Sequence, residues 1–531
     1  MESSAVESPA EVLVAVNPAT GERLADVPAV TPAQLADALR RARRAQRDWG
    51  ARPARERLLA MRSLLELLVR RRDDLAAAVA RETGKPRLEA LTAEVLPVLD
   101  HLDFLLREGE ALLAPRPLRH RLLRSVRSTV RRVPYGVVGV ITPWNYPLFL
   151  AASAGFAALA AGNAVLNKPS ELAPLVGLEL EKLLRDAGLP PALWQCLPGN
   201  GEVGAALVEA GCDKICFTGS VETGRRVAAA CGERLVPCTL ELGGKDAALV
   251  FADADLERAV PALVWGSFTN CGQVCASVER IYVEDSIAHE FTRRFVEQTA
   301  RLRVGTEAEG DFDLGPLVCR AQFEKVRAQV EEARAAGAAV LVGGQGRPGE
   351  GEKARYFYEP TVLGGVSSRL RALREESFGP LVAVVPVGGE EEAVQAANAS
   401  PYGLTASVWT QDPARAERVA ARLQVGSVFV NEVLAPSGAG EAPWGGVKDS
   451  GYGKTRGAEG LLEMTRAQHV AMDRFGVRRA PFWFPYTRRK YELVSSFVPA
   501  LFGGSPTVRL KAGIKGMLGL LGRRTGGDPA S

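Results

Sequence analysis

One short segment of this chain of 531 residues brings two thiols, an amide and a glycine together: Asn270-Cys271-Gly272-Gln273-Val274-Cys275. A cysteine thiolate is a strong nucleophile toward a carbonyl carbon, although a free thiol near pH 7 is mostly protonated. Its adduct with an aldehyde can pass a hydride to a nicotinamide ring and leave a thioester. Cys275 is therefore a candidate nucleophile, and a buried structural cysteine is the alternative.

Two other residues could complete this chemistry. Glu241 lies between leucines and is followed by two glycines, so it is a candidate general base for the water that hydrolyses a thioester. Asn145, in Trp144-Asn145-Tyr146-Pro147, follows an apolar run and could donate its amide N–H to an oxyanion. A surface glutamate and a helix-capping asparagine are the alternatives.

Two glycine-rich turns could bind a dinucleotide. Residues 199–204 fit the pattern G-x-G-x-x-G, but no acidic residue stands clearly about 20 positions further on. Residues 217–224 also join an expected strand to the start of an expected helix, where backbone amides favour phosphate. Lys168 and Glu171 follow another expected strand and form a pair that could bind hydroxyl groups. A tight turn or a surface charge is the alternative for each.

The elements that would hold these candidate residues in place are expected to alternate between helices and strands. The chain is too long for one core, so two or three domains are expected. Buried strands separated by helices predict an α/β fold with parallel, doubly wound sheets. The expected strands lie at 137–141, 164–166, 194–197 and 214–217, and in a second series at 280–283, 339–342, 381–387, 406–409 and 427–430.

Composition excludes several other functions. The net charge of +4 is too small to imply a nucleic-acid partner. The eight cysteines form no disulfide framework and residues 1–11 have no apolar core of a signal peptide, so a cytoplasmic location is expected. The four histidines are far apart, and the pairs Cys212/Cys216 and Cys271/Cys275 lie in unlike contexts, so no metal site is expected.

Together these motifs resemble the aldehyde dehydrogenase superfamily over about residues 16–470. The cysteine segment resembles the family's nucleophile motif, and Cys275 lies 34 positions after Glu241, as is usual in hydrolytic members. Other matching segments are Glu375-Glu376-Ser377-Phe378-Gly379-Pro380, Pro401-Tyr402-Gly403-Leu404 and the glycine-rich run 443–451. The resemblance implies oxidation of an aldehyde to a carboxylic acid, with Cys275 as nucleophile and Glu241 as the base. It also implies that Asn145 and the backbone N–H of Cys275 form the oxyanion hole.

The resemblance further implies a set of cofactor contacts. Lys168 and Glu171 match residues that bind the adenosine ribose, and a glutamate there would repel a 2′-phosphate, which favours NAD over NADP. Glu376 and Phe378 match residues that hold the nicotinamide ribose and ring. The implied contacts are Thr142, Pro143, Trp144, Lys168, Ser170, Glu171, Gly201, Gly219, Ser220, Thr223, Gly224, Leu242, Gly243, Glu376 and Phe378.

The implied fold has two Rossmann-like domains and a small β-arm that builds homodimers or homotetramers. The expected NAD-binding domain covers 1–116 and 134–243, the catalytic domain 244–450, and the arm 117–133 and 451–474. Tyr146 and Trp444 should line the substrate tunnel, which suits apolar aliphatic or aromatic aldehydes. The loop 433–441 carries no Lys or Arg, which disfavours a carboxylated substrate.

A tail at 475–531 extends past the usual end of the family. Apolar residues recur at helical spacing in Leu510, Ile514, Met517, Leu518 and Leu521, with Lys511, Lys515, Arg523 and Arg524 at other positions. This predicts a basic amphipathic helix, which can lie on an anionic membrane surface. A packing element of the enzyme or its oligomer is the alternative.

Two alternative functions remain open. A CoA-acylating aldehyde or semialdehyde dehydrogenase would pass the thioester to CoA, but such members commonly lack a base at the position of Glu241. A non-catalytic structural or membrane-associated member would need to have lost the nucleophile or the base, and the chain has both.

Overall fold

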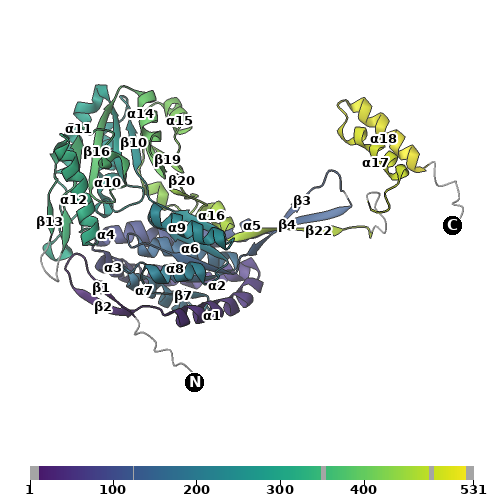
Figure 1. The fold of residues 1–531 in the computed structure, drawn as a ribbon, viewed down its shortest axis with the longest axis horizontal. Coiled ribbons are helices and arrows are strands. Elements are labelled where there is room, and N and C mark those ends of the chain that lie inside the picture. The colour runs from purple at the N-terminus through teal and green to yellow at the C-terminus, as the bar shows by residue number, and fades with distance from the viewer. Residues whose placement is uncertain (1–10, 124, 349–354, 477–482, 522–531) are drawn as a thin grey trace, which may run out of the picture. The chain divides into compact units, whose positions relative to one another are not determined.

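The computed structural model describes residues 11–123, 125–348, 355–476 and 483–521 (Figure 1). The chain divides into a larger unit, Met1–Pro115 with Arg131–Gln468, and a smaller unit, Arg116–Val130 with His469–Ser531. The range 451–474, expected to belong to the arm, is therefore shared between the two units.

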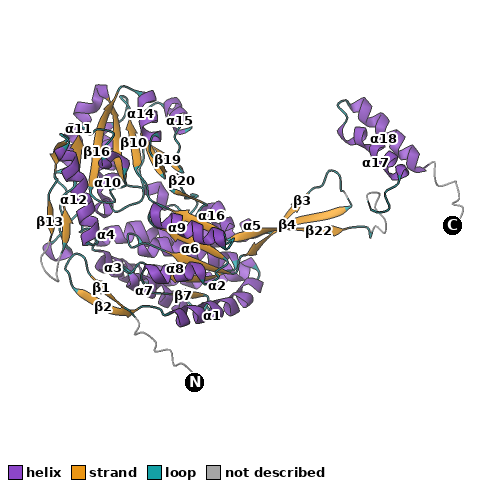
Figure 2. Cartoon of the chain, in the orientation of Figure 1, coloured by secondary structure: helices purple, strands orange, loops and turns teal. Residues whose placement is uncertain are grey.

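The first sheet of the larger unit has six strands in the order β21-β9-β8-β5-β6-β7. Figure 2 shows the helices and strands of this unit packed together. All neighbours are parallel except β21, which pairs antiparallel with β9. The order reverses direction at β5, and helices alternate with the strands, so the expected doubly wound α/β arrangement is confirmed. The strands are β5 (Val137–Ile141), β6 (Ala164–Lys168), β7 (Trp194–Cys196), β8 (Lys214–Thr218), β9 (Cys238–Glu241) and β21 (Gly451–Tyr452).

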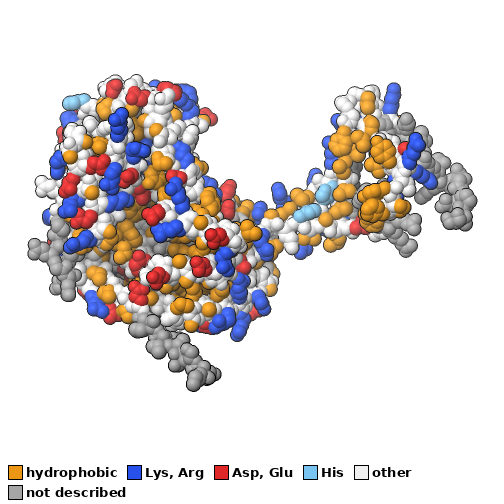
Figure 3. Space-filling model, viewed as in Figure 1, with side chains coloured by type: hydrophobic (Ala, Val, Ile, Leu, Met, Phe, Trp, Pro, Cys, Tyr) orange, Lys and Arg blue, Asp and Glu red, His pale blue; other side chains and the backbone are white. Residues whose placement is uncertain are grey.

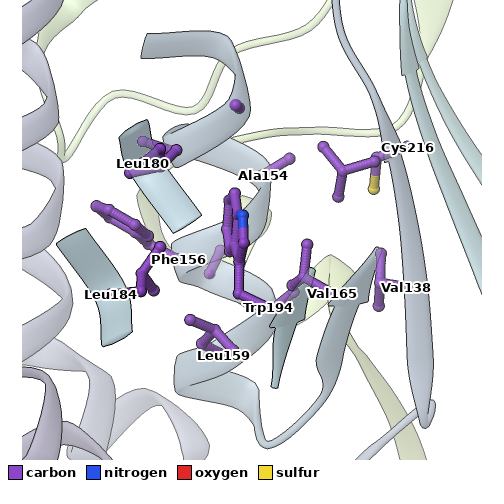
Figure 4. Close-up of a cluster of buried hydrophobic side chains, with 14 of the residues drawn as sticks. Val138, Ala154, Phe156, Leu159, Val165, Leu180, Leu184, Trp194 and Cys216 are labelled. Carbon is purple, nitrogen blue, oxygen red and sulfur yellow. The ribbon is translucent and has the colours of Figure 1, made fainter. Parts of the chain in front are cut away.

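This sheet packs tightly against α6 (Pro147–Ala161), a helix that is apolar and buried almost all round. Trp194 on β7 lies edge-on to Phe156 on α6, with 6.2 Å between the ring centroids (Figure 4). A Cβ on Gly155 would collide with the Trp194 ring, so only glycine permits this close approach. The other helices between the strands are α7 (Pro174–Asp186), α8 (Gly201–Glu209) and α9 (Val221–Glu233).

The N-terminal part adds a hairpin and a helical layer. Thr31 caps the first helix through a reciprocal bond with Gln34, and Gly84, in the left-handed region at φ +76°, ends the third. The elements are β1 (Val12–Val16), β2 (Arg23–Pro28), α1 (Pro32–Ala51), α2 (Ala54–Arg70), α3 (Arg72–Thr83), α4 (Arg87–Ala90), the π-helical turn η1 (Leu91–Val95) and α5 (Leu96–Leu113).

The second sheet has seven strands in the order β12-β15-β16-β11-β10-β18-β19, parallel except for the β12–β15 pair. Its strands are β10 (Asp246–Val250), β11 (Val278–Glu284), β12 (Ala339–Val342), β15 (Thr361–Gly364), β16 (Leu381–Val387), β18 (Thr405–Trp409) and β19 (Ser427–Val430). Its helices are α10 (Leu256–Phe268), α11 (Asp285–Thr299), α12 (Arg320–Ala335), α13 (Arg371–Arg374), α14 (Glu390–Asn398) and α15 (Pro413–Ala420). Short elements complete the unit: β13 (Gly346–Pro348), β14 (Tyr356–Tyr358), β17 (Tyr402–Gly403), β20 (Val447–Lys448) and α16 (Gly457–Glu463).

A third sheet, β22-β4-β3, combines strands from residues 116–134 with one from residues 465–473, and two helices follow β22 in the chain. The strands are β3 (Arg116–Leu118), β4 (Val126–Pro134) and β22 (Thr465–Asp473), and the helices are α17 (Arg488–Phe502) and α18 (Pro506–Leu521). The predicted amphipathic helix corresponds to α18, whereas α17 was not predicted. The residues Arg523 and Arg524 lie outside the described part, as do the side chains of Lys515, Met517, Leu518 and Leu521. No helix in the described part is long and apolar enough to span a membrane.

Candidate active site

The loop that carries Cys275 is held by amide side chains. Asn270 and Cys271 adopt left-handed backbone conformations, at φ 51° and 56°. The Gln273 amide donates to Asn270 O at 3.0 Å and accepts the N–H of Val318 at 2.9 Å. These bonds fix the short turn after α10, so that Cys275 has a defined position. Cys271 is fully buried in the core instead.

Cys275 and Glu241 line the same cavity, of about 280 Å³. The cavity lies beyond the C-terminal end of β9, which carries Glu241, and next to the loop after α10. Its walls are largely apolar, as suits a site that excludes water. Of the residues implied by the resemblance, it is lined by Thr142, Tyr146, Glu241, Leu242, Cys275 and Trp444.

The Asn145 side chain lies against the cysteine loop. It is buried, and its Nδ2 donates to the backbone oxygen of Gln273 at 3.1 Å, two residues before Cys275. The structure therefore holds the amide against the loop that carries Cys275, 130 positions further along the sequence, although Asn145 does not line the cavity of Cys275 and Glu241. An amide held rigidly at such a loop can stabilise negative charge on a carbonyl oxygen without reorganising.

The Glu241 carboxylate is buried, and neither of its oxygens has a hydrogen-bond partner among the described residues. Burial raises its pKa to about 8, although the positive charges of Arg456 and Lys454 lower it. The side chain therefore titrates in the pH range where a general base can take a proton from water and release it again.

Burial also raises the pKa of the Cys275 thiol, and the nearby carboxylates of Asp246, Glu376 and Glu241 add to the effect. The thiol is therefore protonated near neutral pH in the structure as it stands. A base must take its proton before it can attack a carbonyl carbon, and Glu241 is in the same cavity.

One cation in the cavity was missed by sequence reasoning. Arg456, at the start of α16, is buried and lines the cavity, with its guanidinium carbon 4.9 Å from the Phe149 ring centroid and 5.1 Å from that of Trp444. It donates to the backbone oxygen of Ser437. The loop 433–441 has no cation, but Arg456 reaches the cavity from further along the chain. No pattern in the residues around Arg456 predicts this position.

A buried ion pair behind the site, between Lys85 and Glu94, is not predicted by the sequence analysis. Lys85 Nζ donates to Glu94 at 2.8 Å and to the backbone oxygen of Asn145 at 2.6 Å. The other Glu94 oxygen accepts the N–H of Leu148 at 2.8 Å, one of the free N–H groups at the start of α6. Both charged side chains are almost completely buried. The pair fixes the backbone on both sides of Tyr146.

Replacing Lys85 by methionine is expected to destabilise the protein by about 3–5 kcal/mol, because it leaves the Glu94 carboxylate buried without its partner. Chemical unfolding measures the change. Lys182→Met is the matched control, since the Lys182 side chain is exposed and should contribute less than about 1 kcal/mol. Equal unfolding midpoints for the two variants would contradict a stabilising effect of the Lys85–Glu94 pair.

A second cavity, of about 660 Å³, lies beyond the C-terminal ends of β5, β6 and β8. This cavity adjoins the cavity of Cys275 and Glu241, called the catalytic cavity below, because both are lined by Thr142, Phe217 and Thr218. Such a position, where the strand order reverses, is where open α/β sheets bind ligands. Of the implied cofactor contacts, it is lined by Thr142, Pro143, Trp144, Lys168, Ser170, Glu171, Gly201, Gly219, Ser220 and Thr223.

These walls fit a dinucleotide. Ser220 caps α9 by accepting the N–H of Thr223 at 3.3 Å, and the first amides of the helix offer a site for phosphate. A Cβ on Gly219 would lie 2.6 Å from the Phe217 ring, so only glycine allows a close approach here. Lys168 Nζ lies 3.3 Å from the Glu171 carboxylate, a pair that matches the two hydroxyls of a ribose.

The remaining implied contacts lie around Glu376. The Gly244 N–H donates to the Glu376 carboxylate at 3.1 Å, and a Cβ on Gly243 would come 2.5 Å from the same oxygen. The Phe378 ring meets Trp144 edge-on, with 5.4 Å between centroids. A Cβ on Gly224 would collide with Leu242. These residues are thus brought together, although none except Trp144 and Leu242 lines either cavity.

Lys245 supports this region from behind. Its buried ammonium pairs with Glu279 and donates to Ser377 Oγ at 3.0 Å. Glu279 in turn accepts the N–H groups of Ser377 at 2.8 Å and Phe378 at 3.0 Å. The pair therefore orients the segment that carries Glu376 and Phe378. Among the described residues, no group of three or more His, Cys, Asp or Glu side chains could hold a metal ion.

Known proteins match this chain over most of its length. The model of the aldehyde dehydrogenase family matches residues 5–470. A Mycolicibacterium smegmatis protein, provisionally named succinate-semialdehyde dehydrogenase of the NADP(+) type, is 42% identical over 86% of this chain and 87% of its own. The 4,4′-diapolycopene aldehyde oxidase of a Methylomonas species is 40% identical over 92% and 91%. Betaine aldehyde dehydrogenase from Staphylococcus aureus, solved with NAD+, has a TM-score of 0.84 at 31% identity over 89% and 93%.

Proposed function

The chain belongs to the aldehyde dehydrogenase family, and we propose that Cys275, Glu241 and Asn145 carry out its oxidation of an aldehyde to a carboxylic acid. The cofactor is NAD or NADP. The observation that supports the residue assignment is that Cys275 and Glu241 line one cavity, directly beside a second cavity shaped for a dinucleotide.

In the proposed reaction, Glu241 takes the thiol proton and Cys275 sulfur bonds to the carbonyl carbon. The Asn145 amide and the backbone N–H of Cys275 stabilise the resulting oxyanion. Bound NAD(P)+ supplies the acceptor for the hydride, and a thioester on Cys275 remains. Glu241 then releases the thiol proton to solvent and takes a proton from a water molecule, whose oxygen attacks the thioester carbon. The C–S bond breaks, the carboxylic acid leaves, and the thiolate of Cys275 takes the proton from Glu241, so that one proton is released for each aldehyde oxidised.

We propose NAD as the preferred cofactor. The Glu171 carboxylate, held next to Lys168 in the cofactor cavity, is well placed to accept ribose hydroxyls but would repel a 2′-phosphate. We also propose an apolar aliphatic or aromatic aldehyde as substrate, because Tyr146, Phe149 and Trp444 wall the catalytic cavity.

The test is formation of NADH or NADPH by the purified protein across aliphatic aldehydes and benzaldehyde, with Cys275→Ala beside it. Free carboxylic acid and faster turnover with NAD are expected, without any need for CoA. A product that forms only with CoA, as acyl-CoA, would favour the CoA-acylating alternative. Equal activity of the wild type and Cys275→Ala would overturn the assignment of the nucleophile.

Arg456 supports a second candidate substrate, an aldehyde with a carboxylate at its other end. Its buried guanidinium lines the cavity and could pair with an anion, and one relative is named for succinate semialdehyde. The test compares kcat/KM for succinic semialdehyde and butanal in the wild type and in Arg456→Met. This candidate requires that the variant lose at least tenfold more activity with the semialdehyde than with butanal.

Members of the family are typically oligomeric, and we propose that the sheet of β3, β4 and β22 builds a homodimer or homotetramer. Edge strands of such a small sheet carry unpaired backbone groups that another copy can bind. Light scattering on the full chain and on a chain with prolines introduced at Arg466 and Gln468 of the edge strand β22 tests this. An unchanged mass would contradict the role of the arm.

We propose that the protein is cytoplasmic and that its tail contacts an anionic membrane surface. Residues 475–531 contain ten Lys and Arg but two Asp and Glu, although the whole chain has a net charge of only +4. Figure 3 shows hydrophobic side chains gathered over α17 and α18. The exposed apolar side chains of α17 include Tyr491, Val498 and Phe502, at 73%, 49% and 57% exposure. Exposed apolar groups beside basic ones favour the interface of an anionic bilayer.

The full chain is therefore expected to sediment with vesicles that contain anionic lipid, but not with vesicles of phosphatidylcholine alone. A chain that ends at Arg474 should stay in solution with both, and high salt should release the full chain. If the full chain remains in solution with anionic vesicles at low salt, the tail instead packs on protein.

A further inference from the structure

A third cavity, of about 530 Å³, opens directly beside the catalytic one. Thr92, Ala93, Trp265 and Thr269 line both cavities. Residues of α4 and the π-helical turn η1 line it on one side and residues of α10 on the other, and α4 and α10 are labelled next to each other in Figure 1. The third cavity therefore adjoins the catalytic cavity across these four shared residues.

The walls of the third cavity suit a hydrocarbon. Leu88, Val264, Phe268 and Leu302 line it, together with Trp265, whose side chain is 46% exposed where the two cavities meet. Leu88 is 72% exposed. A single exposed apolar side chain is normal at a protein surface, but two of them, Leu88 and Trp265, in a cavity that adjoins a reaction site indicate a ligand surface.

The acidic groups in this cavity already have partners on the protein. The Glu89 carboxylate accepts the Thr269 hydroxyl at 2.8 Å, and Asp313 pairs with Arg303 at 3.0 Å. They therefore do not require a polar group from a ligand.

The volumes support an extended ligand as well. Ligand sites usually measure about 300–1,000 Å³. The catalytic cavity, at about 280 Å³, is just below this range, and the adjoining cavity, at about 530 Å³, is nearly twice as large. A short aldehyde would occupy only the part near Cys275.

We propose that this adjoining cavity binds the distal part of a long, unbranched apolar aldehyde whose carbonyl carbon lies at Cys275. The proposal rests on the proposed function and adds the chain length of the substrate to it. Each methylene moved from water to these walls should raise kcat/KM by about fourfold, until the cavity is filled.

The experiment measures kcat/KM for saturated aldehydes from four to fourteen carbons, each below its micelle concentration, in the wild type and in Leu88→Glu. Leu88 lines the third cavity only and is exposed, so the variant should fold. The expected result is an unchanged value for butanal and a loss of at least tenfold for dodecanal. Leu59→Glu, also at an exposed leucine but in neither cavity, is the matched control and should leave both values unchanged.

Two outcomes would overturn the proposal while leaving the aldehyde oxidation intact. One is a wild type whose kcat/KM does not rise with chain length. The other is a Leu88→Glu variant that treats butanal and dodecanal as the wild type does, which would mean that any gain with chain length comes from elsewhere, for example from the tail at a lipid surface. Failure to oxidise any aldehyde would instead contradict the proposed function.

Discussion

Cys275→Ala is expected to lower turnover by at least about 10⁴-fold, because the reaction then lacks the sulfur that forms the thioester. Binding of NAD should survive, since Cys275 does not line the cofactor cavity. Stopped-flow and steady-state measurements of NADH formation test this, with NAD binding followed by calorimetry.

Cys271→Ala is the matched control. The two thiols are four positions apart, but Cys271 is buried in the core and lines neither cavity, and burial raises the pKa of its thiol. Its removal should change turnover by no more than a few-fold. If Cys271→Ala abolished turnover while Cys275→Ala retained it, with both variants folded, the nucleophile would be misassigned.

Glu241→Gln is expected to separate the two halves of the reaction. Loss of a general base lowers its step by about 10²–10⁴-fold, and here the slowed step should be hydrolysis of the thioester. The variant should then release at most one NADH per site in a burst and turn over slowly afterwards, provided that another base, or a higher pH, removes the thiol proton. Glu257→Gln, at an exposed glutamate of α10, is the control and should behave as the wild type.

The same residue should control the pH dependence. Glu241 acts as a base only when deprotonated, and its pKa is raised to about 8, so wild-type turnover should rise with pH until about that value. The slow steady state of Glu241→Gln should lack this titration. A wild-type profile that is flat from pH 6 to 9 would contradict the assignment.

Stability should change with pH in the opposite direction. Because the pKa of Glu241 is higher in the folded than in the unfolded state, its contribution to stability is fully present below about pH 4.5 and is lost as pH rises through about 8. Glu241→Gln should therefore gain in melting temperature relative to the wild type between pH 6 and pH 9. If the difference in melting temperature between the variant and the wild type stays the same from pH 6 to pH 9, the Glu241 carboxylate is hydrated.

The sequence by itself determined the features that depend on neighbouring residues. Strands such as β5 and β8 were predicted because short runs of apolar residues between turn signals fit a buried strand. The start of α1 is also local, because Thr31 caps the helix by bonding with Gln34, three positions away. Cys275, Glu241 and Asn145 could be proposed because each lies in a short motif of distinctive composition.

Only the tertiary structure decided which distant groups meet. Lys85 binds the backbone of Asn145, 60 positions away, and Arg456 enters the cavity of Cys275 from a helix far along the chain. The third cavity forms where α4 packs near α10, two helices that lie far apart in the sequence. Such contacts form because burial brings together surfaces from different parts of the chain, and the pattern within each segment carries no information about its partner.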